Sequence, residues 1–167
     1  MATHVIVMGV AGSGKSTIAQ MLADRLGLEF AEADRFHPPA NIAKMEQGIP
    51  LNDEDRLPWL TDIAAWIRDR EAEGVSTVVA CSALKRRYRD ILRTGAPDVF
   101  FAHLAGTEDV IRERMASRTG HFFPPALLSS QFRDLEPLEP DERGITLDVT
   151  EPPERIVDRL AAVLAAR

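Results

Sequence analysis

The chain has 167 residues, 45% of them hydrophobic and 28% charged, which is enough for one globular domain with a core and too short for two full ones. The net charge of −6 argues against a nucleic-acid partner, because phosphate backbones attract basic surfaces. No apolar run approaches the roughly 20 residues of a membrane span. Cys81 cannot form an internal disulfide, and the first residues lead directly into a predicted strand, so we expect a cytoplasmic protein.

Residues 9–16 match G-x-x-x-x-G-K-[ST], the pattern of a phosphate-binding loop, or P-loop. The apolar residues 5–8 before it predict a buried strand. The stretch Lys15–Leu26 predicts a helix capped by Gly27, with Ile18, Met21, Leu22 and Leu26 facing the core. Such a loop binds a nucleoside triphosphate through backbone N–H groups, the helix start and the lysine, while the Ser16 hydroxyl is a ligand for Mg²⁺. The predicted nucleotide contacts are Gly9, Ala11, Gly12, Ser13, Gly14, Lys15, Ser16 and Thr17.

Residues 28–33 predict a second strand, which ends beside Asp34, and two prolines then precede a short helix over residues 41–47. In open α/β sheets, ligands bind at the carboxyl ends of strands. Asp34 and His37 are therefore predicted to face a second substrate across from the P-loop. The alternatives are a turn cap for Asp34 and a structural hydrogen bond for His37.

Residues 36–73 predict an inserted helical lobe that can close over a small acceptor. Its long helix starts at Asn52 or Asp53, and its apolar residues recur at helical spacing, so Trp59 and Trp66 are interpreted as core. The acidic residues near its start would form a solvated face, but Arg56 among them could face an anion.

Residues 75–80 predict a central third strand that ends at Cys81, where many P-loop proteins carry an acidic residue for Mg²⁺. We interpret Cys81 as a small buried hydrophobe, so Glu32 and Asp34 become the candidate carboxylates for the metal. The basic residues 85–87 are either an exposed helix face or contacts for an anion.

Residues 99–104 predict a fourth strand, and a helix then runs from Thr107 or Glu108 to Arg118, with Arg114 one turn earlier on the same face. The Gly/Pro-bounded loop after Arg118 and a helix over residues 126–135 resemble a lid, which we assign to residues 119–135. Closure would bring arginines to the transferring phosphoryl group; surface arginines on an amphipathic helix are the alternative. Residues 145–149 predict strand five and residues 152–166 a final helix, and the turn over residues 148–153 could contact the base.

Several short strings together make the chain similar to the gluconokinase family. They are residues 9–16, FHPP with Asn41, LNDEDR with Pro58-Trp59-Leu60, CSALK with Tyr88-Arg89-Asp90, Arg118 with GHFF, Gln131-Phe132 and Asp141-Glu142-Arg143. The resemblance runs through most of the chain. It implies a three-layer α/β P-loop kinase fold with a parallel five-stranded sheet, helices on both faces, a substrate lobe and a lid. It also implies a homodimer that phosphorylates D-gluconate at the 6-hydroxyl with ATP and Mg²⁺. From the net charge and the lack of a long apolar run, we expect no nucleic-acid or membrane partner.

The resemblance also suggests roles for individual residues. Asp34 would accept the proton of the acceptor hydroxyl, while Lys15, Mg²⁺ and the lid residue Arg118, assisted by Arg114, would stabilise the transferring phosphoryl group. The metal would contact Ser16, Asp34 and, through water, Glu32, where relatives often have Asp. The candidate substrate contacts are Asp34, His37, Lys44, Arg56, Lys85, Arg86 and His121, and the carboxylate clamp is left open among Arg56, Lys85 and Arg86.

Three alternatives are weighed against this function. A kinase for shikimate or a nucleoside monophosphate shares the fold, but the FHPP, LNDEDR and GHFF strings speak against it. A guanine-specific switch would be expected to carry an Asn-Lys-x-Asp motif, which this sequence lacks. A non-catalytic paralogue is hard to reconcile with intact Lys15, Ser16, Asp34 and Arg118.

Overall fold

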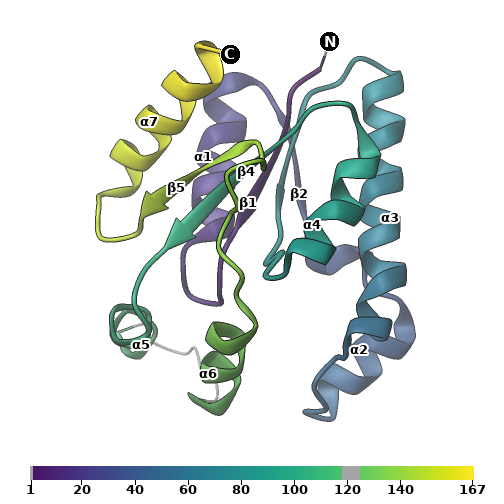
Figure 1. The fold of residues 1–167 in the computed structure, drawn as a ribbon, viewed down its shortest axis with the longest axis vertical. Coiled ribbons are helices and arrows are strands. Elements are labelled where there is room, and N and C mark those ends of the chain that lie inside the picture. Colours follow the sequence, from purple (N-terminus) through teal and green to yellow (C-terminus); the bar gives the residue numbers. More distant parts are fainter. Residues whose placement is uncertain (1, 118–124) are drawn as a thin grey trace.

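The computed structural model describes residues 2–117 and 125–167, which fold into a five-stranded sheet with helices on both faces, as predicted (Figure 1). All strand pairs are parallel, in the order β2-β3-β1-β4-β5. The strands are β1 (His4–Met8), β2 (Glu29–Glu32), β3 (Thr77–Ala80), β4 (Val99–Ala105) and β5 (Gly144–Asp148). The helices are α1 (Lys15–Leu26), α2 (Pro39–Glu46), α3 (Asp53–Ala72), α4 (Arg86–Leu92), α5 (Glu108–Ala116), α6 (Pro125–Asp134) and α7 (Pro153–Ala165), with 3-10 turns η1 (Ala33–Phe36) and η2 (Arg93–Gly95).

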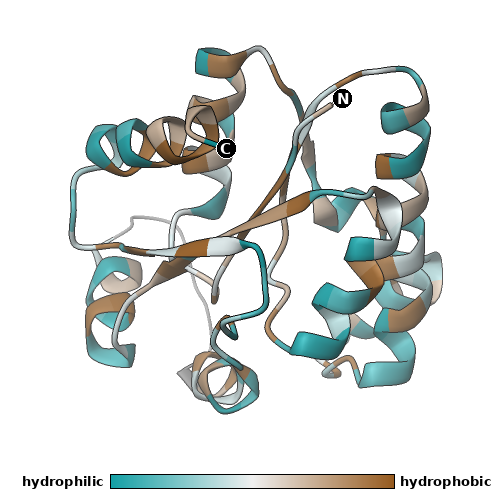
Figure 2. Ribbon diagram, turned by 45° about the horizontal axis from the view of Figure 1, so that its top comes forward, coloured by the Kyte–Doolittle hydropathy of each residue, from teal (hydrophilic) through white to brown (hydrophobic). Residues whose placement is uncertain are grey.

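The sheet separates two apolar layers, because successive side chains of a strand point to opposite faces. In β4, Phe100 and Leu104 pack in the layer that includes α1 and α7, whereas Phe101 packs in the layer that includes α3 and α4. Figure 1 shows these helix pairs on either side of the sheet, and Figure 2 shows apolar strands through the centre with hydrophilic colour on the helices around them. Both faces of the strands are therefore covered, as expected for a parallel sheet.

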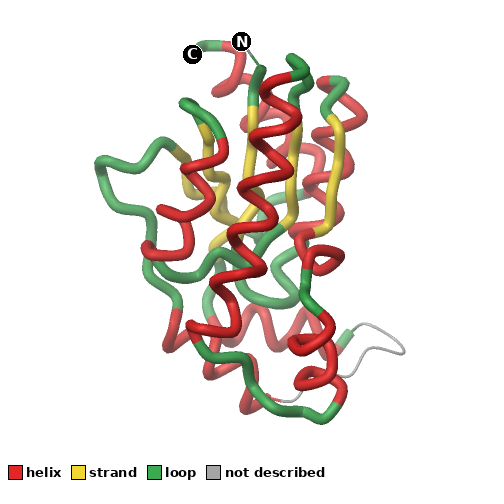
Figure 3. Tube along the Cα trace, turned by 90° about the vertical axis from the view of Figure 1, so that its right-hand side faces the viewer, coloured by secondary structure: helices red, strands yellow, loops and turns green. Residues whose placement is uncertain are grey.

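Helix α3 belongs both to the core and to the end of the molecule where the strands finish. Asn52 caps it in a capping box with Asp55, one of the two N-caps that were predicted. Trp59, Ile63 and Ile67 are buried against the sheet, which confirms the core interpretation of Trp59. Figure 3 shows this long helix passing along the strands and continuing beyond them. The first turns of α3 therefore reach the carboxyl edge of the sheet.

Helix α1 has the predicted bounds and the predicted cap. Gly27 adopts φ 70°, and its N–H donates to Ala23 O. The core prediction for Leu26 is wrong, since this side chain is 41% exposed whereas Ile18 and Leu22 are buried. At 3.6 residues per turn, Leu26 lies about 80° around the helix axis from Ile18, at the margin of the buried face.

The carboxyl ends of the strands carry α2 on one side and α5 and α6 on the other, while both chain termini lie at the opposite end (Figure 1). This edge includes the switch point of the strand order, where β1 lies between β3 and β4, and such points are the usual ligand sites of open α/β sheets. Within residues 2–117 and 125–167, no helix combines the length and the apolarity needed to span a membrane.

Candidate active site

The P-loop joins β1 to α1 and encloses a small phosphate-sized pocket. Its backbone requires glycine: Gly12 and Gly14 have φ values of 79° and 92°, and a Cβ on Gly12 would lie 2.6 Å from Met115 Cγ of α5. The pocket has a volume of about 120 Å³ and is lined by Gly12, Gly14, Lys15, Ser16 and Thr17. The first turn of α1 points its unpaired N–H groups into this region, which favours an anion.

Lys15 is the cation of this pocket. Its Nζ donates to Val10 O at 3.0 Å. Burial lowers the pKa of Lys15, and negative groups nearby, among them Asp34 and Glu32, oppose this shift only in part. Within the described residues, Lys15 forms no ion pair with a carboxylate. A phosphate in the pocket would therefore supply the negative partner that the Lys15 ammonium lacks.

Asp34 lies across from the P-loop, in the turn η1 that follows β2. Its side chain is exposed, whereas Glu32 at the end of β2 is partly buried. Both carboxylates are close enough to Lys15 to affect its pKa. The strand between them and β1 is β3, and Cys81 follows it directly. Cys81 is buried as predicted, and burial raises the pKa of its thiol to about 12. Cys81 is thus neutral, and the negative charge at this edge comes from the β2 side.

His37 is held in place by Trp59 and Asn41. Its ring stacks on Trp59 with centroids 4.3 Å apart, and the Trp59 indole donates to Ala33 O at 2.7 Å. Asn41 Nδ2 donates to Asp55 O at 2.8 Å, which fixes the amide orientation, and it also lies 3.2 Å from His37 Nδ1. Because Nδ1 must accept from this amide, Nε2 carries the proton. Burial lowers the pKa of His37, so the ring is a neutral hydrogen-bond donor.

Arg56 lies beside Tyr88 at the start of α3. Its Nη1 donates to the Tyr88 hydroxyl at 3.2 Å, and that hydroxyl donates to Asp53. Lys85 also donates to Asp53, at 3.1 Å. In the described part of the chain, Arg56 has no carboxylate partner, whereas Lys85 does. Of the candidate clamp residues, Arg56 is therefore the one whose charge is not already neutralised.

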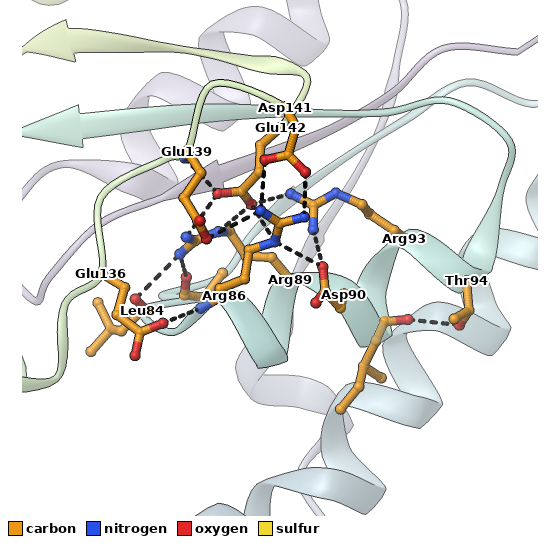
Figure 4. Close-up of polar contacts among 12 residues, drawn as sticks. Leu84, Arg86, Arg89, Asp90, Arg93, Thr94, Glu136, Glu139, Asp141 and Glu142 are labelled. Carbon is orange, nitrogen blue, oxygen red and sulfur yellow. Dashed lines mark hydrogen bonds and ion pairs between the residues drawn. The ribbon is translucent and has the colours of Figure 1, made fainter.

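Two other predicted substrate contacts are engaged elsewhere. Lys44 donates to Asp55 at 2.8 Å and thereby tightens the capping box of α3. Arg86 forms two hydrogen bonds with Asp141, of 2.8 and 2.9 Å, and a third with Asp90. Figure 4 shows Arg86 among acidic side chains of the α6–β5 loop.

The ionic cluster in Figure 4 fastens α4 to the loop between α6 and β5, and we call it the α4 anchor. It comprises Arg86, Arg89 and Arg93 with Asp90, Glu139, Asp141 and Glu142. Arg89 and Glu142 are fully buried at their side chains, and Arg89 Nε donates to Glu142 at 2.7 Å. Arg89 Nη1 also donates to Ala83 O at 2.9 Å, which holds a turn in which Ala83 has φ 44°. The anchor thus fixes the turn that leads from β3 to Lys85.

Arg114 lies beside the P-loop. Its Nη1 donates to Val149 O at 2.8 Å, and its Nη2 is 3.6 Å from a Cβ built on Gly14. It lines a depression of about 230 Å³ whose other residues are Ser13, Gly14, Thr17, Ile18, Val149, Glu151, Pro153 and Ile156. This depression adjoins the P-loop and includes part of the turn predicted to contact the base. The predicted site residues Arg118 and His121 lie outside the described residues.

Four residues contact the site although the sequence analysis assigned them no role in binding or catalysis. Tyr88 and Asp53 connect Arg56 to Lys85, Trp59 supports His37, and Gln131 of α6 accepts a hydrogen bond from Ala11 N at 2.7 Å. All four occur in the strings that carry the family resemblance, which was the available signal. Their partners lie 22 to 120 residues away in the chain, so local spacing could not reveal the contacts.

Comparisons with known proteins show which proteins this chain resembles. The family model described as shikimate kinase matches residues 11–127. The chain is 44% identical to the thermosensitive gluconokinase of Escherichia coli K12, over 97% of this chain and 88% of that one. A sugar kinase from a Janibacter species superposes with a TM-score of 0.94 at 57% identity, covering 99% of this chain and 95% of that one. A gluconokinase from Sinorhizobium meliloti gives a TM-score of 0.87 at 47% identity, covering 98% and 92%.

Proposed function

The chain belongs to the gluconokinase family of P-loop kinases, and from this premise we propose that it transfers the γ-phosphoryl group of ATP to the 6-hydroxyl of D-gluconate. The products would be 6-phospho-D-gluconate and ADP. The observation that carries the proposal is the arrangement at the carboxyl edge of the sheet, where Lys15 lines the P-loop pocket and Asp34 follows directly after β2. A phosphate on the P-loop and a hydroxyl beside Asp34 would then face each other.

Asp34 is the proposed general base. A primary alcohol is a weak nucleophile, and Asp34, exposed at the end of β2, would accept its proton as the oxygen attacks the γ-phosphorus in line. Lys15 would neutralise charge on the phosphoryl oxygens, and Arg118 is proposed to do so from the lid. The Nε2–H of His37 is available to a substrate hydroxyl.

Mg²⁺ is proposed to bind between the P-loop and the β2 carboxylates. Ser16 lines the P-loop pocket, and Asp34 and Glu32 are near enough to Lys15 to raise its pKa electrostatically. The hydroxyl and carboxylate oxygens that Mg²⁺ prefers would therefore lie near a phosphate bound in this pocket. Within the described residues, no group of three His, Cys, Asp or Glu side chains could hold a metal by itself. That arrangement fits a Mg²⁺ ion held mainly by phosphates and water, with Glu32 acting through water. When bound, the ion would neutralise the charge of the β- and γ-phosphates.

Arg56 is the proposed clamp for the carboxylate of gluconate. A guanidinium can bind a planar carboxylate through two parallel hydrogen bonds, which an ammonium cannot do. Arg56 has no carboxylate partner among the described residues, while the charge of Lys85 is shared with Asp53. We propose Lys85 as a supporting cation and Lys44 as a more distant one. Arg86 is the weakest of the three clamp candidates, because it is saturated by the α4 anchor.

The depression beside Arg114 is the proposed site of the adenine. It adjoins the P-loop and combines apolar walls from Ile18 and Ile156 with polar groups, as nucleotide pockets generally do. Arg114 would cover the phosphates from this side. The resemblance further implies a homodimer, which light scattering on the purified protein would test.

The experiment that tests this function is a coupled measurement of ADP release with ATP, Mg²⁺ and a panel of acceptors. The panel contains D-gluconate, related sugar acids, shikimate, AMP and no acceptor. Turnover with D-gluconate alone is the expected result. Turnover of shikimate or AMP without gluconate would overturn the substrate assignment and, with it, the roles proposed for Arg56 and Lys85.

A further inference from the structure

Helix α6 and the residues that follow it contact the rest of the molecule at several described positions. Leu128 is buried in the core, and Ser129 bonds to Glu108 and Arg112 of α5. Beyond the helix, Glu136 N donates to Leu84 O at 2.7 Å. Between these points, Gln131 contacts the P-loop through the bond from Ala11 N. The predicted lid region, residues 119–135, therefore includes a helix that is docked on the P-loop.

The contact falls on the turn of the P-loop over residues 10–13, which we call the outer turn. Val10 O, one residue before Ala11, accepts from both Lys15 Nζ and Ser13 N. Gly12, one residue after it, lies against Met115 of α5. Three contacts therefore hold the outer turn. Gln131 of α6 bonds to Ala11, Met115 of α5 lies against Gly12, and Val10 O accepts hydrogen bonds from within the loop.

The chemistry of the bond fixes the orientation of the glutamine. A backbone N–H can only donate, so the atom 2.7 Å from Ala11 N must be the amide oxygen of Gln131. This bond satisfies a loop N–H group that faces α6 and leaves the N–H groups of the first turn of α1 available to phosphate. An apolar side chain at position 131 would leave Ala11 N–H without this acceptor.

We propose that Gln131 is a positioning residue, which acts through Ala11 to hold the outer turn of the P-loop in the geometry that binds the terminal phosphate of the nucleotide. The inference rests on the proposed function in one respect, that the anion on the P-loop belongs to ATP. If the outer turn contacts the terminal phosphate in this way, loss of the bond should affect the binding of ATP more than that of ADP.

The test compares Gln131→Met, which removes the acceptor at similar length, with Gln131→Glu, which keeps an acceptor oxygen. Ser129→Ala is the matched control, because it loosens α6 from α5 without removing a partner of the P-loop. Amide hydrogen exchange of Ala11 by NMR reads the bond directly. Calorimetric titration with ATP and with ADP reads its effect on the loop, and kcat and KM are measured for gluconate and ATP.

In Gln131→Met we expect Ala11 to exchange about five- to tenfold faster, and ATP to bind about fivefold more weakly with ADP changed less than about twofold. Gln131→Glu should restore the protection of Ala11, and Ser129→Ala should leave both quantities at wild-type values. Equal weakening of ATP and ADP, or equal effects of Ser129→Ala, would overturn the proposal in favour of a general packing role for α6. The binding and exchange measurements need no acceptor. If the wild-type protein does not phosphorylate gluconate, the proposed substrate is refuted, but the test of Gln131 can still be made.

Discussion

The charged groups around the P-loop and those of the α4 anchor differ in how completely they are paired. Lys15, Arg56 and Arg114 are bound to neutral oxygens, namely Val10 O, the Tyr88 hydroxyl and Val149 O. In the anchor, by contrast, every arginine contacts at least one carboxylate. The buried Arg89 donates one hydrogen bond to each carboxylate oxygen of Glu142. One region leaves positive charge for a ligand, whereas the other uses up its charge in holding two segments together.

The difference shows how the same residue types serve binding in one place and structure in another. A buried or partly buried cation without an anion is costly, and ligand binding removes that cost. A saturated ion pair gains nothing from an anionic ligand, but it is strongly destabilised when one partner is removed. Substitutions in the first region should therefore change catalysis with little effect on stability, and substitutions in the second should do the reverse.

The largest effect is expected for Asp34→Asn, which removes the proposed base. We expect kcat with gluconate to fall about 1,000-fold, within the range of general base catalysis, while the protein folds and binds ATP as before. Steady-state kinetics and ATP titration provide the measurement. Near-normal turnover in this variant would exclude Asp34 as the base.

Lys15→Met should reduce turnover by about 100- to 1,000-fold, because it removes a charge that stabilises the transferring phosphoryl group. Its midpoint of urea unfolding should be unchanged or higher, since burial of the ammonium, which lowers its pKa, is no longer a cost. If the midpoint instead falls as far as is expected for an anchor variant, Lys15 stabilises the fold and the distinction between binding and structural charges fails for this residue.

Glu142→Gln should lower the free energy of unfolding by about 3 kcal/mol, because it leaves the buried charge of Arg89 without its partner. Burial alone would raise the pKa of Glu142, but hydrogen bonds, first of all from Arg89, outweigh it and lower the pKa to about 2. The wild-type protein therefore has this stabilisation in full above pH 4.5 and loses it as the pH falls toward about 2. Urea unfolding at several pH values should show this loss in the wild type and not in the variant, with kcat per folded molecule changed little.

The smallest effect is expected for Asp53→Asn. Asp53 accepts hydrogen bonds from Lys85 and Tyr88, so it lies between Arg56 and the helix α4 that carries the anchor arginines. Hydrogen bonds from Tyr88 and Lys85 lower the pKa of Asp53, so it is ionised and orders the partners of Arg56. We expect KM for gluconate to rise about threefold, in line with a partly exposed ion pair. A lower KM would instead indicate that Asp53 competes with the substrate carboxylate for the same cations.

Much of the fold could be predicted because the signals were local. The P-loop lies within eight consecutive residues, Gly27 ends α1 by its own conformation, and Asn52 caps α3 through a residue three positions away. The bounds of the elements depend less on local signals: residues 85–87 indicate an exposed helix face or an anion contact, and among the described residues no side-chain cap marks the start of α4 (Arg86–Leu92).

The parts of the site that could not be predicted depend on contacts between distant segments. Arg86 resembled a clamp residue because it follows the end of β3, but its acceptor Asp141 is 55 residues away and is brought near by the α6–β5 loop. The sequence likewise contains no local sign that Tyr88 lies between Arg56 and Asp53, or that Gln131 bonds to Ala11. Which of several cations is left unpaired is decided by the tertiary structure.

The stack of His37 on Trp59 also gives the protein an optical probe at the proposed acceptor site. Trp59 is buried and its ring stacks 4.3 Å from that of His37, so we expect its emission to respond to changes at His37. Trp66, the other tryptophan, packs edge-to-face on Phe36. In a Trp66→Phe background, the remaining fluorescence would come from a side chain in contact with His37. A ligand that engages the His37 ring would then change the emission, so acceptor binding could be titrated without a label and without turnover.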